Sequence, residues 1–129
     1  MNGNILLDTS IVIPFFNNDI SIREKLSKAQ NVFVPFVVIG ELYYGAYKSF
    51  RTIENIRRID IFVNDSVVLS YSTEVAREYG KLKTELKNQG SPIPENDIWI
   101  GAVARHFNLT LATRDQHFSQ IKLLKTEYW

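Results

Sequence analysis

The sequence predicts an α/β fold: a central, mostly parallel sheet of four to five short strands with helices on both faces. Short apolar runs, such as residues 4–8, 32–34 and 67–69, lack the polar alternation of half-exposed strands, which is typical of strands buried on both sides. Longer segments with apolar residues at helical spacing separate these runs. Strands that alternate with helices along a chain are typical of parallel sheets.

The first strand, over residues 4–8, is followed by a helix that runs through residues 11–13. Thr9 and Ser10 are expected to cap this helix, because hydroxyl side chains bind the free amides at a helix N-terminus. Pro14 is then expected in the first turn, where a helix tolerates proline.

A second short helix is expected over residues 20–29, a strand over 32–34 and a helix from about 36 to 48. Apolar residues then recur at steps of three or four over 51–63 and over 73–88. This spacing predicts two amphipathic helices.

Between these two helices, the apolar run at residues 67–69 predicts a third strand. A glycine and two prolines then break the helical pattern at 88–94 and predict a loop. An apolar helix over 94–107 follows, with a fourth strand over 109–112 and a fifth over 121–124.

Composition limits the function classes. At 129 residues, with 45% hydrophobic residues, the chain is expected to form one domain over residues 1–129. Fifteen basic and fourteen acidic residues nearly cancel, which argues against a nucleic-acid binder that acts through bulk charge. The absence of cysteine excludes thiolate metal sites. No signal-peptide pattern and no apolar run of ~20 residues is found, so we expect a cytoplasmic protein without a membrane partner.

Four acidic residues lie within or beside apolar segments: Asp8, Glu41, Asp97 and Asp115. A carboxylate beside a buried segment is costly unless its charge is compensated. Asp8 ends the first strand and Asp115 lies just past the fourth, and parallel sheets bind ligands beyond the carboxyl ends of their strands. If the four acids meet, they repel one another, and a divalent cation would remove that repulsion.

Each acid alone also has an ordinary explanation. Asp8 and Asp97 could cap helices, Asp115 could be a turn residue, and Glu41 could lie on a solvated helix face. The ordinary explanations together require four separate coincidences, each where a strand end or a pocket-facing helix turn is expected. Gly101, one turn after Asp97 on the same helix face, is expected to leave room for a metal or a phosphate.

The segments around the four acids resemble those of PIN domains, in the same order along the chain. These segments are residues 7–10, 38–42, 94–104 and 111–118. The length of the chain and the order of its segments most resemble the VapC-type toxin ribonucleases of toxin–antitoxin pairs.

The resemblance implies a PIN-like three-layer fold and an endoribonuclease, dependent on Mg²⁺ or Mn²⁺, that hydrolyses phosphodiester bonds in RNA. It also implies a cognate antitoxin whose tail lies across the active-site groove, and a homodimer. The apolar and aromatic residues of 11–16 and 36–47 would suit such contacts.

The same resemblance implies that the acids form the catalytic metal site, with a hydroxyl neighbour. The acids are Asp8, Glu41, Asp97 and Asp115; the neighbour is Thr113. Ser10 is a weaker candidate for the hydroxyl role.

Basic residues and histidines near these segments carry further expectations. Arg114, between Thr113 and Asp115, is expected nearest the scissile phosphate, and so to bind substrate. His106 and His117 lack the usual spacing of histidine metal ligands, so we expect them at the surface or at the edge of the core.

Three tyrosines share the helix of Glu41, and core or interface packing is favoured for them over a stacking platform for unpaired bases. They are Tyr43, Tyr44 and Tyr47.

Two other function classes lack a required residue. A phosphatase of the haloacid dehalogenase type needs an aspartate where this chain has Ser10, and a signalling receiver needs an acid where the third strand ends at Ser70 and Tyr71. The open alternative is a PIN-like module that binds RNA or a protein with little or no nuclease activity.

Overall fold

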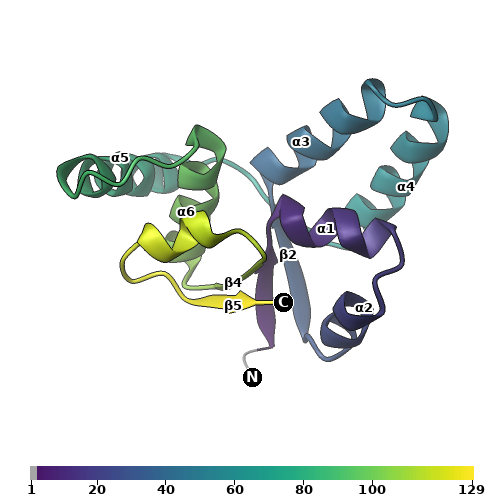
Figure 1. The fold of residues 1–129 in the computed structure, drawn as a ribbon, viewed down its shortest axis with the longest axis horizontal. Helices are drawn as coiled ribbons and strands as arrows, with labels where there is room; N and C mark the ends of the chain where they lie inside the picture. Colours follow the sequence, from purple (N-terminus) through teal and green to yellow (C-terminus); the bar gives the residue numbers. More distant parts are fainter. Residues whose placement is uncertain (1–2) are drawn as a thin grey trace.

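The structure is a computed structural model that describes residues 3–129. Within these residues, five parallel strands form one sheet in the order β3-β2-β1-β4-β5. In chain order the strands are β1 (Asn4–Leu7), β2 (Asn31–Pro35), β3 (Val67–Leu69), β4 (Thr110–Thr113) and β5 (Thr126–Tyr128). The predicted α/β fold with a parallel sheet is confirmed (Figure 1).

Helices connect these strands. They are α1 (Thr9–Phe16), α2 (Ile20–Ser27), α3 (Phe36–Tyr47), α4 (Thr52–Asn64), α5 (Thr73–Asn88), α6 (Glu95–Phe107) and the 3₁₀ turn η1 (Gln116–Gln120). Among residues 3–129, no helix combines the length and the apolarity that a membrane span requires.

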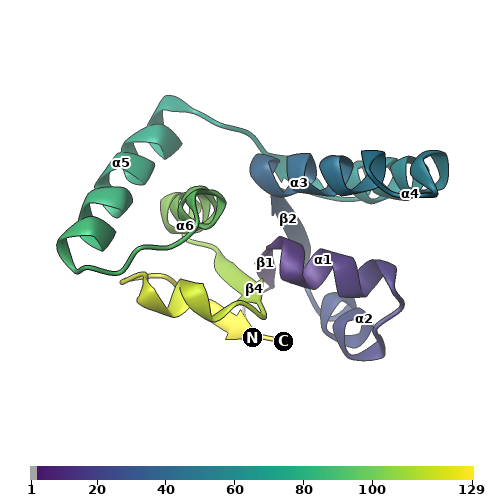
Figure 2. The ribbon, with the colours of Figure 1, turned by 45° about the horizontal axis from the view of Figure 1, so that its top comes forward.

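The helices lie in layers on both sides of the sheet. Helices α1 to α4 carry the chain in one direction, from β1 to β2 to β3, and α5 and α6 carry it back to β4. Because such crossovers are right-handed, this reversal places α5 and α6 on the opposite face from α1 to α4. Figures 1 and 2 show this arrangement, with β1 and β4 between the two groups of helices. Accordingly, every residue of β4 is buried.

The change of direction marks the edge of the sheet at which such folds bind ligands. Strand β1 pairs with β2 on one side and with β4 on the other. Where neighbouring strands of a parallel sheet lead to helices on opposite faces, a crevice opens beyond their carboxyl ends. Asp8 follows β1 directly and Thr113 ends β4, so both residues lie at this carboxyl edge of the sheet.

The start of α1 differs from the prediction. Asp8, rather than Thr9 or Ser10, is the N-cap, and its side chain accepts a hydrogen bond from Ser10 N. Since the helix begins at Thr9, Pro14 lies beyond the first turn. Pro14 removes the amide donor to the Ser10 carbonyl, and the helix ends two residues after Pro14, at Phe16.

Two expectations for the C-terminal half are also wrong: the strand over 121–124 and the open space beside Gly101. The position of Ile121 explains both. Residues 121–124 form a bend and a turn instead of a strand, because Ile121 is drawn into the core while Leu123 is 90% exposed at φ 62°. A Cβ on Gly101 would lie 2.7 Å from Ile121 Cδ1 and 3.2 Å from Leu82 Cδ2. Core side chains, and not a ligand, therefore occupy the space beside Gly101.

Candidate metal-binding active site

Asp8 is the most deeply buried acid of the site. The residue is 3% exposed. Its Oδ1 accepts hydrogen bonds from Ser10 N (2.7 Å) and Ser10 Oγ (2.6 Å), and its Oδ2 accepts one from Thr113 Oγ1 (2.6 Å). Burial raises the pKa of Asp8, the bonds from Ser10 and Thr113 oppose that rise, and the charge of Asp115 adds to it. The carboxylate is thus fixed in orientation by α1 and β4.

The hydroxyl groups of Thr113 and Ser10 join the ends of β1 and β4. Thr113 is fully buried, and its Oγ1 accepts a hydrogen bond from Asp115 N (2.9 Å) while it donates to Asp8. Ser10 Oγ accepts a hydrogen bond from Arg114 N (2.9 Å). Both predicted hydroxyl residues therefore lie against Asp8 and position the chain around it.

Glu41 reaches the site from α3. Its Oε1 accepts a hydrogen bond from Thr9 Oγ1 (2.7 Å), and its Oε2 accepts one from Asn96 Nδ2 (3.3 Å). These bonds connect α3 to the starts of α1 and α6. Glu41 is therefore not a solvated surface residue but the link between three helices at the carboxyl edge of the sheet.

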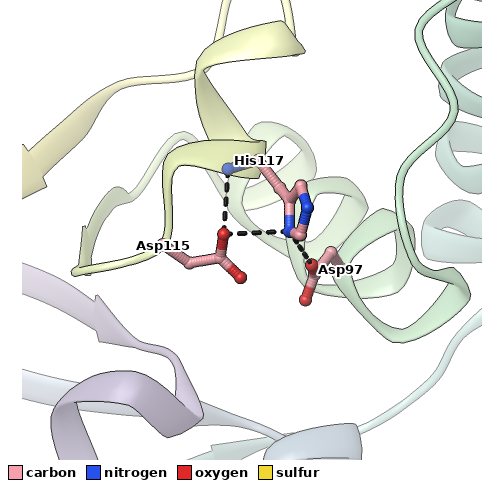
Figure 3. Close-up of side chains that lie close together, drawn as sticks. All are labelled: Asp97, Asp115 and His117. Carbon is pink, nitrogen blue, oxygen red and sulfur yellow. Dashed lines mark hydrogen bonds and ion pairs between the residues drawn. The ribbon is translucent and has the colours of Figure 1, made fainter.

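Asp97, Asp115 and His117 converge on one point (Figure 3). Each offers a ligand atom within 4.8 Å of the other two. His117 Nδ1 lies 2.9 Å from Asp115 Oδ1 and 3.4 Å from Asp97 Oδ2. The figure shows the ring of His117 between the two carboxylates, with α6 supplying Asp97 and the start of η1 supplying the other two.

His117 was missed from the sequence as a member of this site. Asp115 is the N-cap of η1 and accepts a hydrogen bond from His117 N (2.9 Å). A capping aspartate holds the residue two positions later against its own carboxylate. The spacing Asp115-Gln116-His117 after a buried strand was the available signal. In contrast, His106 is exposed and contacts the ring of Phe107, as expected.

The electrostatics show that the four acids act on one another. Burial, first, and then the charges of Asp115, Asp8 and Glu41 together raise the pKa of Asp97 to about 6, although His117 acts in the opposite direction. Negative charge therefore accumulates at Asp97. Carboxylate oxygens are the ligands that Mg²⁺ and Mn²⁺ prefer, and imidazole is compatible with a transition metal. The donor set fits a divalent cation.

Arg114 contributes its backbone to the site and directs its side chain elsewhere. The guanidinium donates to Asp19 Oδ2 (3.1 Å) and to the carbonyl oxygen of Trp129 (2.7 Å). Hydrogen bonds, first from the Ile22 amide and then from Arg114, lower the pKa of Asp19. The structure thus uses Arg114 to join the end of β4 to the start of α2, and does not bring its charge to the four acids.

The three tyrosines of α3 divide into two kinds. Tyr43 is half-buried and donates a hydrogen bond to Asp60 of α4, which raises the pKa of Tyr43 to about 12. Tyr44 and Tyr47 are each 68% exposed. Of these three tyrosines, therefore, only Tyr43 has a position that packing within the chain explains.

Comparison with known proteins identifies the family. The family model of the PIN domain matches residues 5–124. The chain is 36% identical to the ribonuclease VapC2 of Haemophilus influenzae (strain KW20 / Rd) over 127 residues, and 34% identical to the tRNA(fMet)-specific endonuclease VapC of Shigella flexneri over 127 residues. Each of these matches covers 96% of both chains.

Solved structures give the same result. A chain in the crystal structure of VapBC2 from Rickettsia felis, bound to a DNA fragment from its promoter, superposes with a TM-score of 0.91 at 31% identity, covering 97% of this chain and 98% of that one. A chain of VapBC-1 from nontypeable Haemophilus influenzae superposes with a TM-score of 0.89 at 32% identity, covering 97% of each. The chain belongs to the PIN-domain family and, within it, to the VapC-type ribonucleases.

Proposed function

We propose that this protein is a metal-dependent endoribonuclease that hydrolyses phosphodiester bonds in RNA. The observation that carries the proposal is the gathering of Asp8, Glu41, Asp97 and Asp115 at the carboxyl edge of the sheet, where their charges act on Asp97. The similarity to VapC ribonucleases over 96% of the chain supports it.

The four acids would hold a Mg²⁺ or Mn²⁺ ion. When bound, the ion would activate water and neutralise charge on the scissile phosphate. Ser10 and Thr113 hold the Asp8 carboxylate in one orientation, and Thr9 and Asn96 do the same for Glu41. Such preorganisation spares the site from reordering its ligands during the reaction.

His117 is an additional member of the proposed site. Its Nδ1 contacts both Asp97 and Asp115, so it can carry a proton between the two carboxylates or act as a further ligand. Ser10 Oγ and the backbone of Arg114 are the remaining polar groups that we propose near the substrate, because they lie against Asp8 and Thr113.

We further propose that the protein is the toxin of a toxin–antitoxin pair, that it forms a homodimer and that it acts in the cytoplasm. The similar Rickettsia felis and Haemophilus influenzae structures are VapBC complexes. A groove of about 260 Å³ runs between α1 and the α3–α4 hairpin and reaches Glu41. Its apolar lining includes Ile13, Phe16, Leu42 and Ile59, and it suits a segment of the antitoxin.

The test is cleavage of labelled RNA by the wild-type protein with Mg²⁺, Mn²⁺ or EDTA. A single-stranded pool and tRNA(fMet), the substrate in the name of the Shigella flexneri relative, are the first substrates. We expect cleavage that requires a metal, is lost in Asp97→Asn and is kept in Asp65→Asn, the same change at an exposed position after α4.

Equal cleavage by wild type and Asp97→Asn would remove Asp97 from the site. Binding of RNA without cleavage under any metal, by folded protein free of antitoxin, would favour a binding module instead.

A further inference from the structure

We propose that the exposed rings of Phe36 and Tyr71 form a stacking surface for a nucleobase of the RNA that is being cut. The inference rests on the proposed ribonuclease function and assigns a substrate-binding subsite to it. Phe36 begins α3, and Tyr71 lies in the segment between β3 and α5. The two residues are 51% and 48% exposed.

The rings lie at a shallow hollow that is continuous with the acidic site. The hollow has a volume of about 380 Å³, and Phe36, Gly40, Glu41, Tyr44, Tyr71 and Asn96 line it. Glu41 belongs to both the hollow and the site, and Asn96, the neighbour of Asp97, donates a hydrogen bond to Glu41 (3.3 Å). A nucleotide whose phosphate lies at the acids therefore has this hollow beside it.

A row of aromatic rings fixes the surface in place. The Phe36 and Tyr71 ring centres lie 5.4 Å apart, and those of Tyr71 and Trp99 lie 4.9 Å apart. Trp99 in turn stacks on Tyr79, with ring centres 3.9 Å apart and planes at 8°. Trp99 and Tyr79 pack against the core. Rings that are already held lose little freedom on binding, which favours stacking of a ligand.

The chemistry of the hollow favours RNA over a protein surface. Aromatic side chains stack on the flat faces of unpaired bases without regard to sequence. Glu41 and Asn96 offer hydrogen-bonding groups at the same hollow, which a base edge can use and an apolar protein surface cannot. Because the hollow shares Glu41 with the acidic site, a strand bound at the acids can reach it.

The ring variants test the proposal through binding and kinetics. Phe36→Leu and Tyr71→Leu keep an apolar side chain and remove the ring, and Phe36→Tyr and Tyr71→Phe keep the ring. We expect the leucine variants to raise KM roughly 5- to 100-fold with kcat little changed, since one stacked base contributes that much to binding. The ring-preserving variants should behave as wild type.

A filled hollow gives an independent test with a matched control. A Cβ added at Gly40 meets no atom within 4 Å, and the same holds for Gly80 on α5, outside the hollow. A Cβ is therefore accommodated at both positions, and helix propensity favours leucine over glycine there. Gly40→Leu should raise KM as the ring variants do, and Gly80→Leu should not.

The decisive comparison uses RNA in which each nucleotide near the cut is made abasic in turn. At one position, removal of the base should weaken binding to wild type as much as Phe36→Leu weakens the binding of intact RNA. Phe36→Leu and wild type should then bind this abasic RNA with the same affinity. If Phe36→Leu instead binds every abasic RNA more weakly than wild type does, and by the same factor at each position, the proposal is overturned. A shift from dimer to monomer in sedimentation of Phe36→Leu would also overturn it and assign the rings to a protein interface.

Failure of this proposal is distinguishable from failure of the nuclease function. Binding of a fluorescent single-stranded RNA is measured by anisotropy in EDTA, without cleavage. If wild type cuts no RNA, the nuclease function fails. Even in that case, the proposed stacking surface is tested by the anisotropy curves. It fails if wild type and Phe36→Leu give the same curve, and it stands if Phe36→Leu binds RNA more weakly.

Discussion

At the residue scale, Asp97 is where the charges of the acidic site have their largest effect. Its pKa is raised to about 6 by burial and by the neighbouring carboxylates. A carboxyl group whose pKa is higher in the folded than in the unfolded protein destabilises the fold once it ionises. In the metal-free protein this destabilisation is absent below pH ~4, grows as pH rises and is complete above the folded pKa of about 6.

Asp97→Asn should therefore stabilise the metal-free protein at neutral pH. We expect the free energy of unfolding to rise by ~2 kcal/mol, which corresponds to a Tm increase of roughly 5 °C or more. The measurement is thermal unfolding in EDTA at pH 7.5 and at pH 4. A variant that melts below wild type at pH 7.5, or that gains equally at both pH values, would show that charge repulsion is not the cause.

Thr113 gives a second prediction for a single residue. Thr113→Val keeps the shape of the side chain but removes the donor to buried Asp8 and the acceptor for Asp115 N. The loss should lower the free energy of unfolding by about 1–3 kcal/mol. Thr113→Ser, which keeps the hydroxyl, should lose much less. Urea unfolding of both variants measures the difference, and equal stabilities would mean that the hydroxyl does not support Asp8.

At the element scale, an ion cluster holds α5 against α6. The Arg105 side chain is 6% exposed, and its guanidinium contacts Glu78 and Glu85 of α5, with 2.9 Å from Nη1 to Glu85 Oε1. Its Nη1 also donates to the carbonyl oxygen of Lys122 (3.2 Å). The hydrogen bond from Arg105 lowers the pKa of Glu85 despite partial burial.

Arg105→Met should destabilise the helix pair in a pH-dependent way. We expect a loss of about 2–4 kcal/mol at neutral pH, because both glutamates lose a nearly buried partner. Since the pKa of Glu85 is lowered in the folded protein, its contribution is present above the ordinary glutamate pKa and is lost as pH falls below it. The difference between wild type and variant should shrink below pH ~4.

Urea unfolding across pH 3 to 8 measures that difference, with Arg77→Met on the exposed face of α5 as the control. A pH-independent loss would assign Arg105 a packing role instead.

The elements were predictable where local periodicity decides them. Helix α5 has the predicted bounds, 73–88, because its apolar stripe is regular and Ser72 caps its start through Val75 N. Residues 121–124 were misassigned because an apolar run does not reveal whether its residues share a strand or send a single side chain into the core. The partner of Ile121 is Gly101, distant in the sequence.

At the scale of the whole molecule, the strand order explains why the four acids meet. The sequence indicated the four carboxylates, and the parallel sheet brings the strand ends beside Asp8 and Asp115 to one edge. Glu41 and Asp97 reach that edge from α3 and α6. The sequence did not indicate that the ring of His117 lies between Asp97 and Asp115, because that contact depends on how η1 packs against α6. Nor did it indicate that the guanidinium of Arg114 is engaged by Asp19, which arrives from α2.

The measurement that most directly tests the central claim is calorimetric titration of the RNA-free protein with Mn²⁺. The account predicts saturable binding to wild type and to Asp65→Asn. Binding to Asp97→Asn should be at least about tenfold weaker, since even the loss of a residue that only hydrogen-bonds to a metal ligand weakens binding about 10–100-fold. Equal Mn²⁺ affinity in wild type and Asp97→Asn would contradict the claim that these carboxylates form one metal site.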